Sequence, residues 1–103
     1  MIQVIVSRTA RADLINISSY VREELASPMA AARIMGKLKK SIESLREYPE
    51  KGKPLDEILP VHTDYRFLVC ENYRIFYLFD GSSVEVVRVL HTLQDYMRAL
   101  FRE

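Results

Sequence analysis

The stretch NYRIFYLFDGSSVEVVRVLH, residues 72–91, carries the clearest structural signal in this chain. Two runs of β-branched and aromatic residues, 73–79 and 83–90, flank the dipeptide Asp80-Gly81. This dipeptide between two such runs is typical of a β-hairpin, because the tight turn needs residues that tolerate a positive φ. The sequence therefore predicts two neighbouring antiparallel strands.

Both predicted strands are apolar on their two alternating faces. In the first strand one face is expected to carry Ile75, Tyr77 and Phe79, and the other Phe76 and Leu78. In the second strand one face is expected to carry Val84, Val86 and Leu90, and the other Val87 and Val89. Interior strands of a sheet that is covered on both sides show this pattern. We therefore expect a layer of structure on each face of the sheet.

Two more strands are predicted upstream of the hairpin. Residues 65–70 are joined to it by the two-residue connection Glu71-Asn72, and the β-branched segment 2–6 lies at the start of the sequence. Residues 54–63 contain two prolines and no apolar period. That composition predicts a turn-rich connection between helix and strand.

Two helices are predicted between residue 7 and residue 48. Apolar residues recur three or four positions apart over 10–25, and Ser7 or Thr9 can cap this first helix. The second helix is expected over 28–48, with Ser27 as its cap and Pro28 at the first helical position, where a missing N–H costs nothing. Together they predict a helical hairpin.

A short helix is predicted at the C-terminal end of the sequence. Thr92 can cap it, and Leu93, Met97 and either Leu100 or Phe101 form its apolar stripe. The resulting order is β-α-α-β-β-β-α, one α+β domain over residues 1–103. We expect an antiparallel sheet with the helical hairpin packed on one face.

Composition excludes several functional classes. Fifteen Lys and Arg against fourteen Asp and Glu give a net charge of +1, so bulk charge alone does not predict nucleic-acid binding. The single cysteine, Cys70, excludes an internal disulfide and a multi-cysteine zinc site, and is expected to be a buried thiol. No phosphate-binding loop or membrane-spanning apolar run is present. We expect a cytoplasmic protein with no cofactor, no metal and no membrane contact.

The residues most able to carry chemistry are polar side chains in apolar strands. Arg74 and Arg88 interrupt the hairpin strands and Arg66 precedes another apolar run, while His91 ends the last strand. A guanidinium there needs an anion or a route to solvent. Two interpretations stay open: the arginines pair with nearby carboxylates for structure, or they line a concave face that stabilises a phosphate.

A basic segment is a second candidate for binding. Residues 31–54 hold seven basic and three acidic side chains. Lys37, Lys40, Lys51 and Lys53 belong to this segment. Such a set is usually a solvated helix face, but it can also meet an acidic partner or a phosphate backbone.

Taken together, the chain resembles the RelE/ParE toxin superfamily over nearly its whole length. The resemblance rests on Val6-Ser7, Ala12-Asp13-Leu14, Ile17, Ser27-Pro28, Ala31-Ala32, Leu45, Pro49, Gly52, the stretches 72–77 and 84–91, and Asp95. It implies the toxin of a bacterial type II toxin–antitoxin pair, which arrests growth when free of its antitoxin. The apolar grooves expected beside the helical hairpin would suit an acidic, amphipathic antitoxin.

RelE-like members cleave messenger RNA on the ribosome without a metal, through attack of a ribose 2′-hydroxyl on the adjacent phosphate. By position, the resemblance implies Arg74 as the phosphate-stabilising arginine, Arg66 as a second basic residue and His91 as the general acid/base. It implies Tyr96 as the aromatic residue that stacks on a base or orients the hydroxyl.

The chain departs from that subgroup at two positions. Leu68 stands where RelE-like toxins carry a second lysine, and the C-terminal arginine falls near Gln94. The stretch 88–91 with Asp95, and the turn 49–52, resemble instead the ParE-like members, which poison DNA gyrase without cleaving RNA. The sequence therefore favours gyrase as the target, with the ribosome and its messenger RNA as the alternative.

Overall fold

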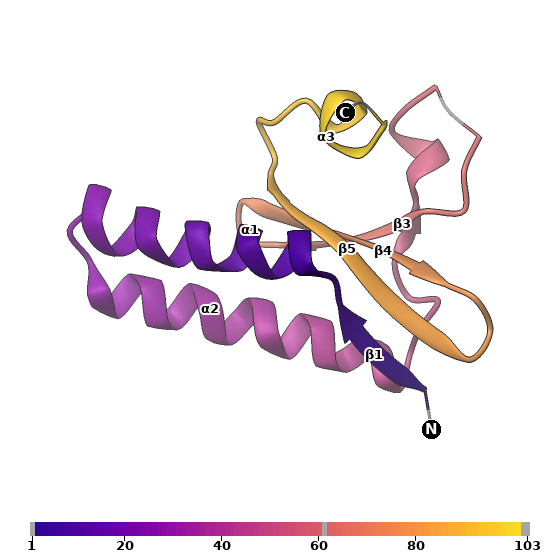
Figure 1. Cartoon of the computed structure of the whole chain (residues 1–103), viewed down its shortest axis with the longest axis horizontal. Helices are drawn as coiled ribbons and strands as arrows, with labels where there is room; N and C mark the ends of the chain where they lie inside the picture. The colour runs from indigo at the N-terminus through magenta and orange to yellow at the C-terminus, as the bar shows by residue number, and fades with distance from the viewer. Residues whose placement is uncertain (1, 61, 102–103) are drawn as a thin grey trace.

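Five strands form one sheet in the order β1-β5-β4-β3-β2 (Figure 1). The computed structural model describes residues 2–60 and 62–101. Its elements are β1 (Gln3–Val6), α1 (Arg8–Ser19), α2 (Pro28–Glu43), β2 (Lys53–Pro54), β3 (Arg66–Cys70), β4 (Tyr73–Phe79), β5 (Ser83–His91) and α3 (Tyr96–Phe101). β1 runs parallel to β5, and the other neighbours are antiparallel. The predicted α+β class and order are confirmed, and the two-residue strand β2 is added to them. The parallel pairing of β1 with β5 departs from the antiparallel sheet that we expected, because β1 reaches the edge of β5 without a direct hairpin connection.

The turn between β4 and β5 forms as predicted. Gly81 has a φ of 98°, and the Asp80 carboxylate accepts hydrogen bonds from the backbone N–H groups of Ser82 at 2.9 Å and Ser83 at 2.8 Å. These bonds lower the pKa of Asp80 from 3.8 to about 2. The Asp80 side chain, which directly follows β4, therefore organises the turn into β5.

We expect the hairpin turn to weaken in acid. The folded pKa of Asp80 lies below its unfolded value, so this carboxylate stabilises the fold above pH 3.8 and that contribution is lost as the pH falls toward 2. Asp80→Ala should flatten the fall in thermal midpoint between pH 4 and pH 2, measured by circular dichroism. An unchanged slope in the variant would show that other groups cause the loss.

Both predicted helix starts are confirmed. The Ser7 hydroxyl accepts from the N–H of Ala10 at 3.0 Å, and the Ser27 hydroxyl accepts from that of Ala30 at 3.2 Å. α2 ends at Glu43, before the predicted end at residue 48, and a 3₁₀ turn, Ser44–Arg46, follows. This tighter turn satisfies the last carbonyls of the helix.

The end of the first helix differs from the prediction. Residues Tyr20–Glu24 form a π-helical turn, and Leu25, expected on the buried stripe, is 58% exposed. A π turn bonds five residues apart instead of four and so rotates the following side chains around the axis. The N–H of Leu25 donates to the carbonyl of Tyr20 at 3.4 Å, which is such a bond.

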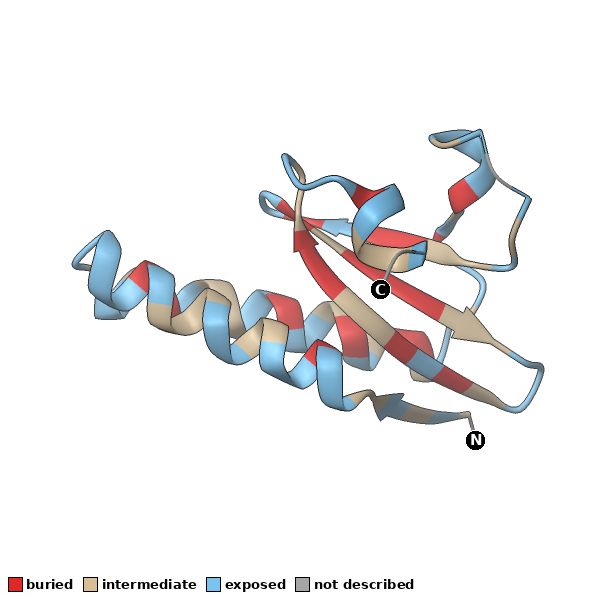
Figure 2. Ribbon diagram, turned by 45° about the horizontal axis from the view of Figure 1, so that its top comes forward, coloured by how far each residue is buried: buried red, intermediate tan, exposed pale blue. Residues whose placement is uncertain are grey.

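The sheet is covered on both faces, as the apolar strands predicted. α1 and α2 lie side by side against one face, which we call the hairpin face, and α3 lies over the other, the α3 face (Figure 1). Buried residues run along the central strands between these layers (Figure 2). The hairpin face includes Leu38, Ile42, Tyr73, Ile75, Tyr77, Val84, Val86 and Val89. The α3 face includes Leu55, Phe67, Phe76, Leu90 and Tyr96.

The predicted faces of β5 are wrong beyond its middle. Val89 packs on the hairpin face and Leu90 on the α3 face, the reverse of simple alternation. Phe76 pairs with Arg88 and the next residue of β4 pairs with Val86, so the residue between them on β5 has no partner. One extra residue in a strand is a β-bulge, and it inverts the alternation that follows.

The last helix begins later than predicted. The N–H of Thr92 donates to the carbonyl of Asn72 at 2.9 Å, so this residue still belongs to the strand end and does not cap a helix. The carboxylate of Asp95 accepts from the N–H of Arg98 at 3.1 Å and caps α3. Leu93, expected on the apolar stripe, precedes the helix and is 87% exposed, and Met97 is exposed as well. The later start of the helix turns Tyr96, Ala99 and Leu100 toward the sheet instead.

Candidate functional site

Arg88 is tied to the first helix by a bidentate ion pair. Its Nε and Nη2 donate to the two carboxylate oxygens of Asp13 on α1 at 2.8 and 2.9 Å, and its Nη1 donates to the carbonyl of Ala99 at 3.2 Å. The N–H of Val89 donates to the same carboxylate at 2.9 Å. The hydrogen bond to Asp13 raises the pKa of Arg88. Arg88 therefore pairs with a carboxylate on a helix, as expected if the strand arginines serve the structure of the fold.

The Arg74 guanidinium lies between two aromatic rings. Its Cζ is 5.2 Å from the ring centroid of Phe67 and 5.2 Å from that of Tyr96. Its Nη1 donates to the Tyr96 hydroxyl at 2.9 Å, and this hydroxyl donates to the carbonyl of Thr92 at 3.1 Å. Within residues 2–60 and 62–101 its buried Nε has no hydrogen-bond partner and no carboxylate forms a salt bridge with it. Aromatic faces take the place of an anion here.

Arg66 is held by the loop that follows α2. Its Nη1 donates to the carbonyls of Gly52 at 2.8 Å and Glu50 at 3.3 Å, and its Nη2 lies 4.0 Å from the Glu50 carboxylate. It lies two residues before Leu68 on β3 and therefore points to the same side of the sheet, the hairpin face. This guanidinium therefore anchors the loop to the sheet in the free protein.

His91 lies on the hairpin face at the end of β5. Its ring meets the ring of Tyr73 edge to face, with centroids 5.5 Å apart, and its Nδ1 accepts from the N–H of Leu93 at 3.1 Å. With Tyr20 and Arg88 it lines a hollow of about 630 Å³ between α1 and β5. Burial raises the pKa of Tyr73 above its usual value.

The sheet divides the residues to which the RelE resemblance gives catalytic roles. Arg74 and Tyr96 are in contact on the α3 face, whereas His91 lies on the hairpin face. Arg66 is also on the hairpin face, but its register partner on β4 is four residues from that of His91. Four residues of strand span about 13 Å. The structure thus joins Arg74 to Tyr96 and separates the other two residues from that pair and from each other.

The predicted basic residues lie along α2 and in the loop after it. Lys37 lies 3.6 Å from the Glu71 carboxylate, which also accepts a hydrogen bond from Arg33. These contacts, that of Arg33 first, lower the pKa of Glu71. Lys51 donates to the hydroxyl of Ser44 at 2.8 Å, while Lys40 and Lys53 are exposed.

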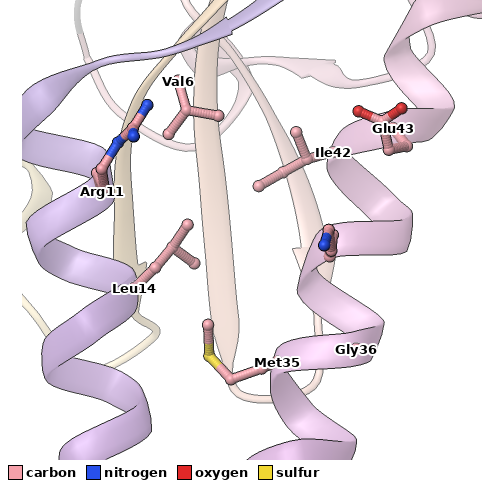
Figure 3. A pocket seen from close by; sticks show the side chains of 8 residues that line it. Val6, Arg11, Leu14, Met35, Gly36, Ile42 and Glu43 are labelled. Atoms are coloured by element: carbon pink, nitrogen blue, oxygen red, sulfur yellow. The ribbon is translucent and has the colours of Figure 1, made fainter.

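An apolar groove of about 590 Å³ lies between α1 and α2 (Figure 3). Leu14 and Met35 project into it from opposite sides, and Val6 and Ile42 line its upper part. Grooves beside the hairpin were expected from the sequence, but these lining residues were not identified. The sequence feature that could have indicated this groove is Gly36, a glycine in the interior of a predicted helix. Gly36 also lines the groove.

Metal ligands do not cluster in the part of the chain that the structure describes. There, no three His, Cys, Asp or Glu side chains lie close enough together to hold an ion. Cys70 is a buried free thiol, as predicted. The helices of this same part are too short or too polar to span a membrane.

A sheet between a helical hairpin and a short C-terminal helix, with arginines in the central strands and an apolar groove in the hairpin, defines the class of RelE/ParE-fold toxins. Residues 4–96 match the family described as the ParE toxin of the type II toxin–antitoxin system parDE. Because that match covers most of the sequence, the chain belongs to this family of toxins, and the predicted superfamily is confirmed.

Individual relatives lie on both sides of the superfamily. The chain is 36% identical over 91 residues to Toxin RelE2 of Caulobacter vibrioides, which covers 88% of this chain and 96% of that protein. It resembles the chromosomal ParDE system of P. aeruginosa (TM-score 0.73, 19% identity, covering 88% of this chain and 96% of that one). It also resembles a chain in the structure of the toxin–antitoxin complex RelBE2 from Mycobacterium tuberculosis. The TM-score is 0.63 at 26% identity, and the match covers 87% of this chain and 96% of that one. The first of these structures supports the fold alone.

Proposed function

We propose that this toxin arrests growth by binding DNA gyrase, and that it does not cleave RNA. The observation that carries the proposal is the division of the RelE-like residues between the two faces of the sheet. The family match over residues 4–96, to a ParE toxin, points the same way.

Cleavage by a 2′-hydroxyl requires three groups around one phosphate: a base for the hydroxyl proton, cations for the developing charge and an acid for the departing oxygen. Each must lie within about 3 Å of its reacting atom. Arg74 is on the α3 face and His91 on the hairpin face, so one phosphate does not reach both. A non-enzymatic, binding mode of inhibition needs no such assembly.

The state of Arg74 gives further support. One N–H of the Arg74 Nη1 already donates to the Tyr96 hydroxyl, and the guanidinium lies between the rings of Phe67 and Tyr96. A phosphate that draws the guanidinium out of this position costs these contacts. Cation–π contacts of a desolvated guanidinium contribute about 2 kcal/mol. In the free protein Arg74 is therefore a structural link between β4 and α3.

The alternative is RelE-like cleavage of ribosome-bound messenger RNA. Two observations favour it: the 36% identity to Toxin RelE2 and the contact between Arg74 and Tyr96, the two residues that the resemblance places at the phosphate and the base. In this alternative the Arg74–Tyr96 pair acts without His91, and α3 shifts to open the site.

Arg74→Met separates the two mechanisms. Methionine keeps apolar volume between the rings and removes a half-buried charge that has no carboxylate partner in the described residues, so the fold should be retained. We expect growth arrest within about twofold of wild type in cells that lack the antitoxin, where a twofold change is about 0.4 kcal/mol. Loss of toxicity in a variant that remains folded, as shown by its circular dichroism spectrum, would favour cleavage.

Pulse labelling after induced expression tests the target in cells. With gyrase as the target, protein synthesis continues while DNA synthesis falls, cells filament and DNA damage is induced. An immediate fall in protein synthesis, with messenger RNA cut inside translated frames, would overturn the proposal.

We further propose that a small antitoxin binds in the groove between α1 and α2. The groove offers apolar side chains from both helices, which suits the apolar face of an amphipathic helix. Glu43 at its rim is paired with Arg46 at 3.0 Å, whereas Arg11 and Lys39 form no salt bridge within residues 2–60 and 62–101. This leaves an excess of positive charge for an acidic partner. One of the related structures is titled a toxin–antitoxin complex.

A further inference from the structure

We infer that Gly36 is the point at which the antitoxin helix crosses α2 at close range, so that the missing side chain is a requirement of the partner. The inference rests on the proposed docking of that helix in the groove between α1 and α2. It adds the residue that sets how closely the two helices approach.

The packing of this chain gives no reason for a glycine at position 36. Gly36 lies in the interior of the 16-residue helix α2, where glycine is less favourable than alanine. Among residues 2–60 and 62–101, a Cβ built there meets nothing within 4 Å, and the φ of Gly36 is not positive. Gly52 and Gly81 differ, because the first would clash with Tyr77 and the second has a φ of 98°. The explanation for Gly36 is therefore sought outside the chain.

The position of Gly36 within the groove points to a partner. It is exposed, it lies beside Met35 on the wall formed by α2, and it leaves the helix backbone bare on that side (Figure 3). Packed helices lie about 8–10 Å apart, depending on the side chains at the contact. A residue with no side chain brings the axes to the lower end of that range. Leu14, on the opposite wall, then contacts the far side of the same inserted helix.

Charge around Gly36 specifies the chemistry of this helix. Lys39 lies one turn further along α2 and lines the groove, and Arg11 lines it from α1. A helix that crosses at Gly36 can therefore place acidic side chains against these two cations on either side of an apolar contact. The occupant is an acidic amphipathic helix with a buried apolar residue at the crossing point.

The test measures binding and stability on the same variants. The probe is the purified cognate antitoxin of this toxin, and its dissociation constant is measured by titration calorimetry. Gly36→Ala and Gly36→Leu introduce one and four carbons at the crossing point. Arg33→Leu introduces the same leucine side chain on α2 outside the groove, and Met35→Glu disrupts the apolar wall of the groove itself.

Gly36→Ala should stabilise the free toxin and at the same time weaken its binding to the antitoxin. We expect Gly36→Ala to raise the thermal midpoint of the free toxin by about 4 °C. The same change should weaken antitoxin binding about tenfold, and Gly36→Leu about a hundredfold. Arg33→Leu should leave the dissociation constant within about twofold of wild type.

Two results would overturn the inference about Gly36, and only the second would also overturn the proposed docking in the groove. If Met35→Glu weakens binding while Gly36→Leu does not, the antitoxin docks in the groove but does not cross closely at Gly36. If neither change weakens binding, the antitoxin binds elsewhere and the proposed docking fails with the inference. Neither result bears on gyrase as the target.

Discussion

Gly52→Ala is expected to destabilise the protein by about 3 kcal/mol. A Cβ at this position would lie 2.6 Å from the Tyr77 hydroxyl oxygen, 2.7 Å from its Cε1 and 2.9 Å from the carbonyl oxygen of Phe67. Tyr77 is fully buried, and its hydroxyl accepts from the N–H of Gly52 at 2.9 Å. Relief of the clash breaks this bond and moves a core side chain. The thermal midpoint should fall by about 12 °C or more.

Gly36→Ala is the matched control for this variant. It adds the same methyl group at a position where nothing lies within 4 Å. Urea unfolding of both variants therefore separates a local clash from a general effect of replacing glycine. Equal midpoints for Gly52→Ala and the wild type would contradict the packing described for Tyr77.

Asp13→Ala is expected to cost about 3 kcal/mol as well. The Asp13 side chain is 12% exposed and accepts three hydrogen bonds, two from Arg88 and one from the N–H of Val89. Its removal leaves a partly buried guanidinium and a backbone donor without their partner. Because these bonds connect α1 to β5 next to the bulge, the loss should appear as an earlier unfolding transition in urea.

A double variant isolates the charge from the packing. Asp13→Leu combined with Arg88→Met replaces the ion pair by apolar side chains, which is often close to neutral for such pairs. We expect the double variant to recover about half of the stability lost in Asp13→Ala, as read from the urea midpoint. If the double variant is less stable than the single one, the pair contributes net stability of its own.

Local chemistry made much of the fold predictable. Ser7, Ser27 and the turn at Asp80-Gly81 each satisfy backbone groups within three residues of themselves, so their roles are visible in sequence. The apolar content of both faces of β4 and β5 likewise predicted a sheet with structure on each side. These features depend on nearest neighbours along the chain.

The errors arise where distant residues decide the structure. The bulge in β5 depends on its pairing with β4, and it inverts Val89 and Leu90 although alternation holds before it. Thr92 resembles a helix cap but is held by Asn72, twenty residues earlier. The π turn over Tyr20–Glu24 also interrupts the helical period and places Leu25 at the surface.

The candidate site was predictable as a set of residues but not as an arrangement. Arg74 and Tyr96, 22 residues apart, do meet. The partner of Arg88 is 75 residues away on α1, where Asp13 is one of several polar residues in the sequence. That His91 and Arg74 lie on opposite faces depends on the register of β5 against β4. No spacing within either strand alone reveals it.

Gyrase inhibition is tested directly by a supercoiling assay with purified gyrase, run beside cell-free translation with the same toxin preparation. We expect that supercoiling is inhibited as toxin is titrated in, that the antitoxin reverses this, and that translated messenger RNA stays intact. Supercoiling that is unaffected at a large molar excess of toxin, with messenger RNA cut on the ribosome, would contradict the proposed function.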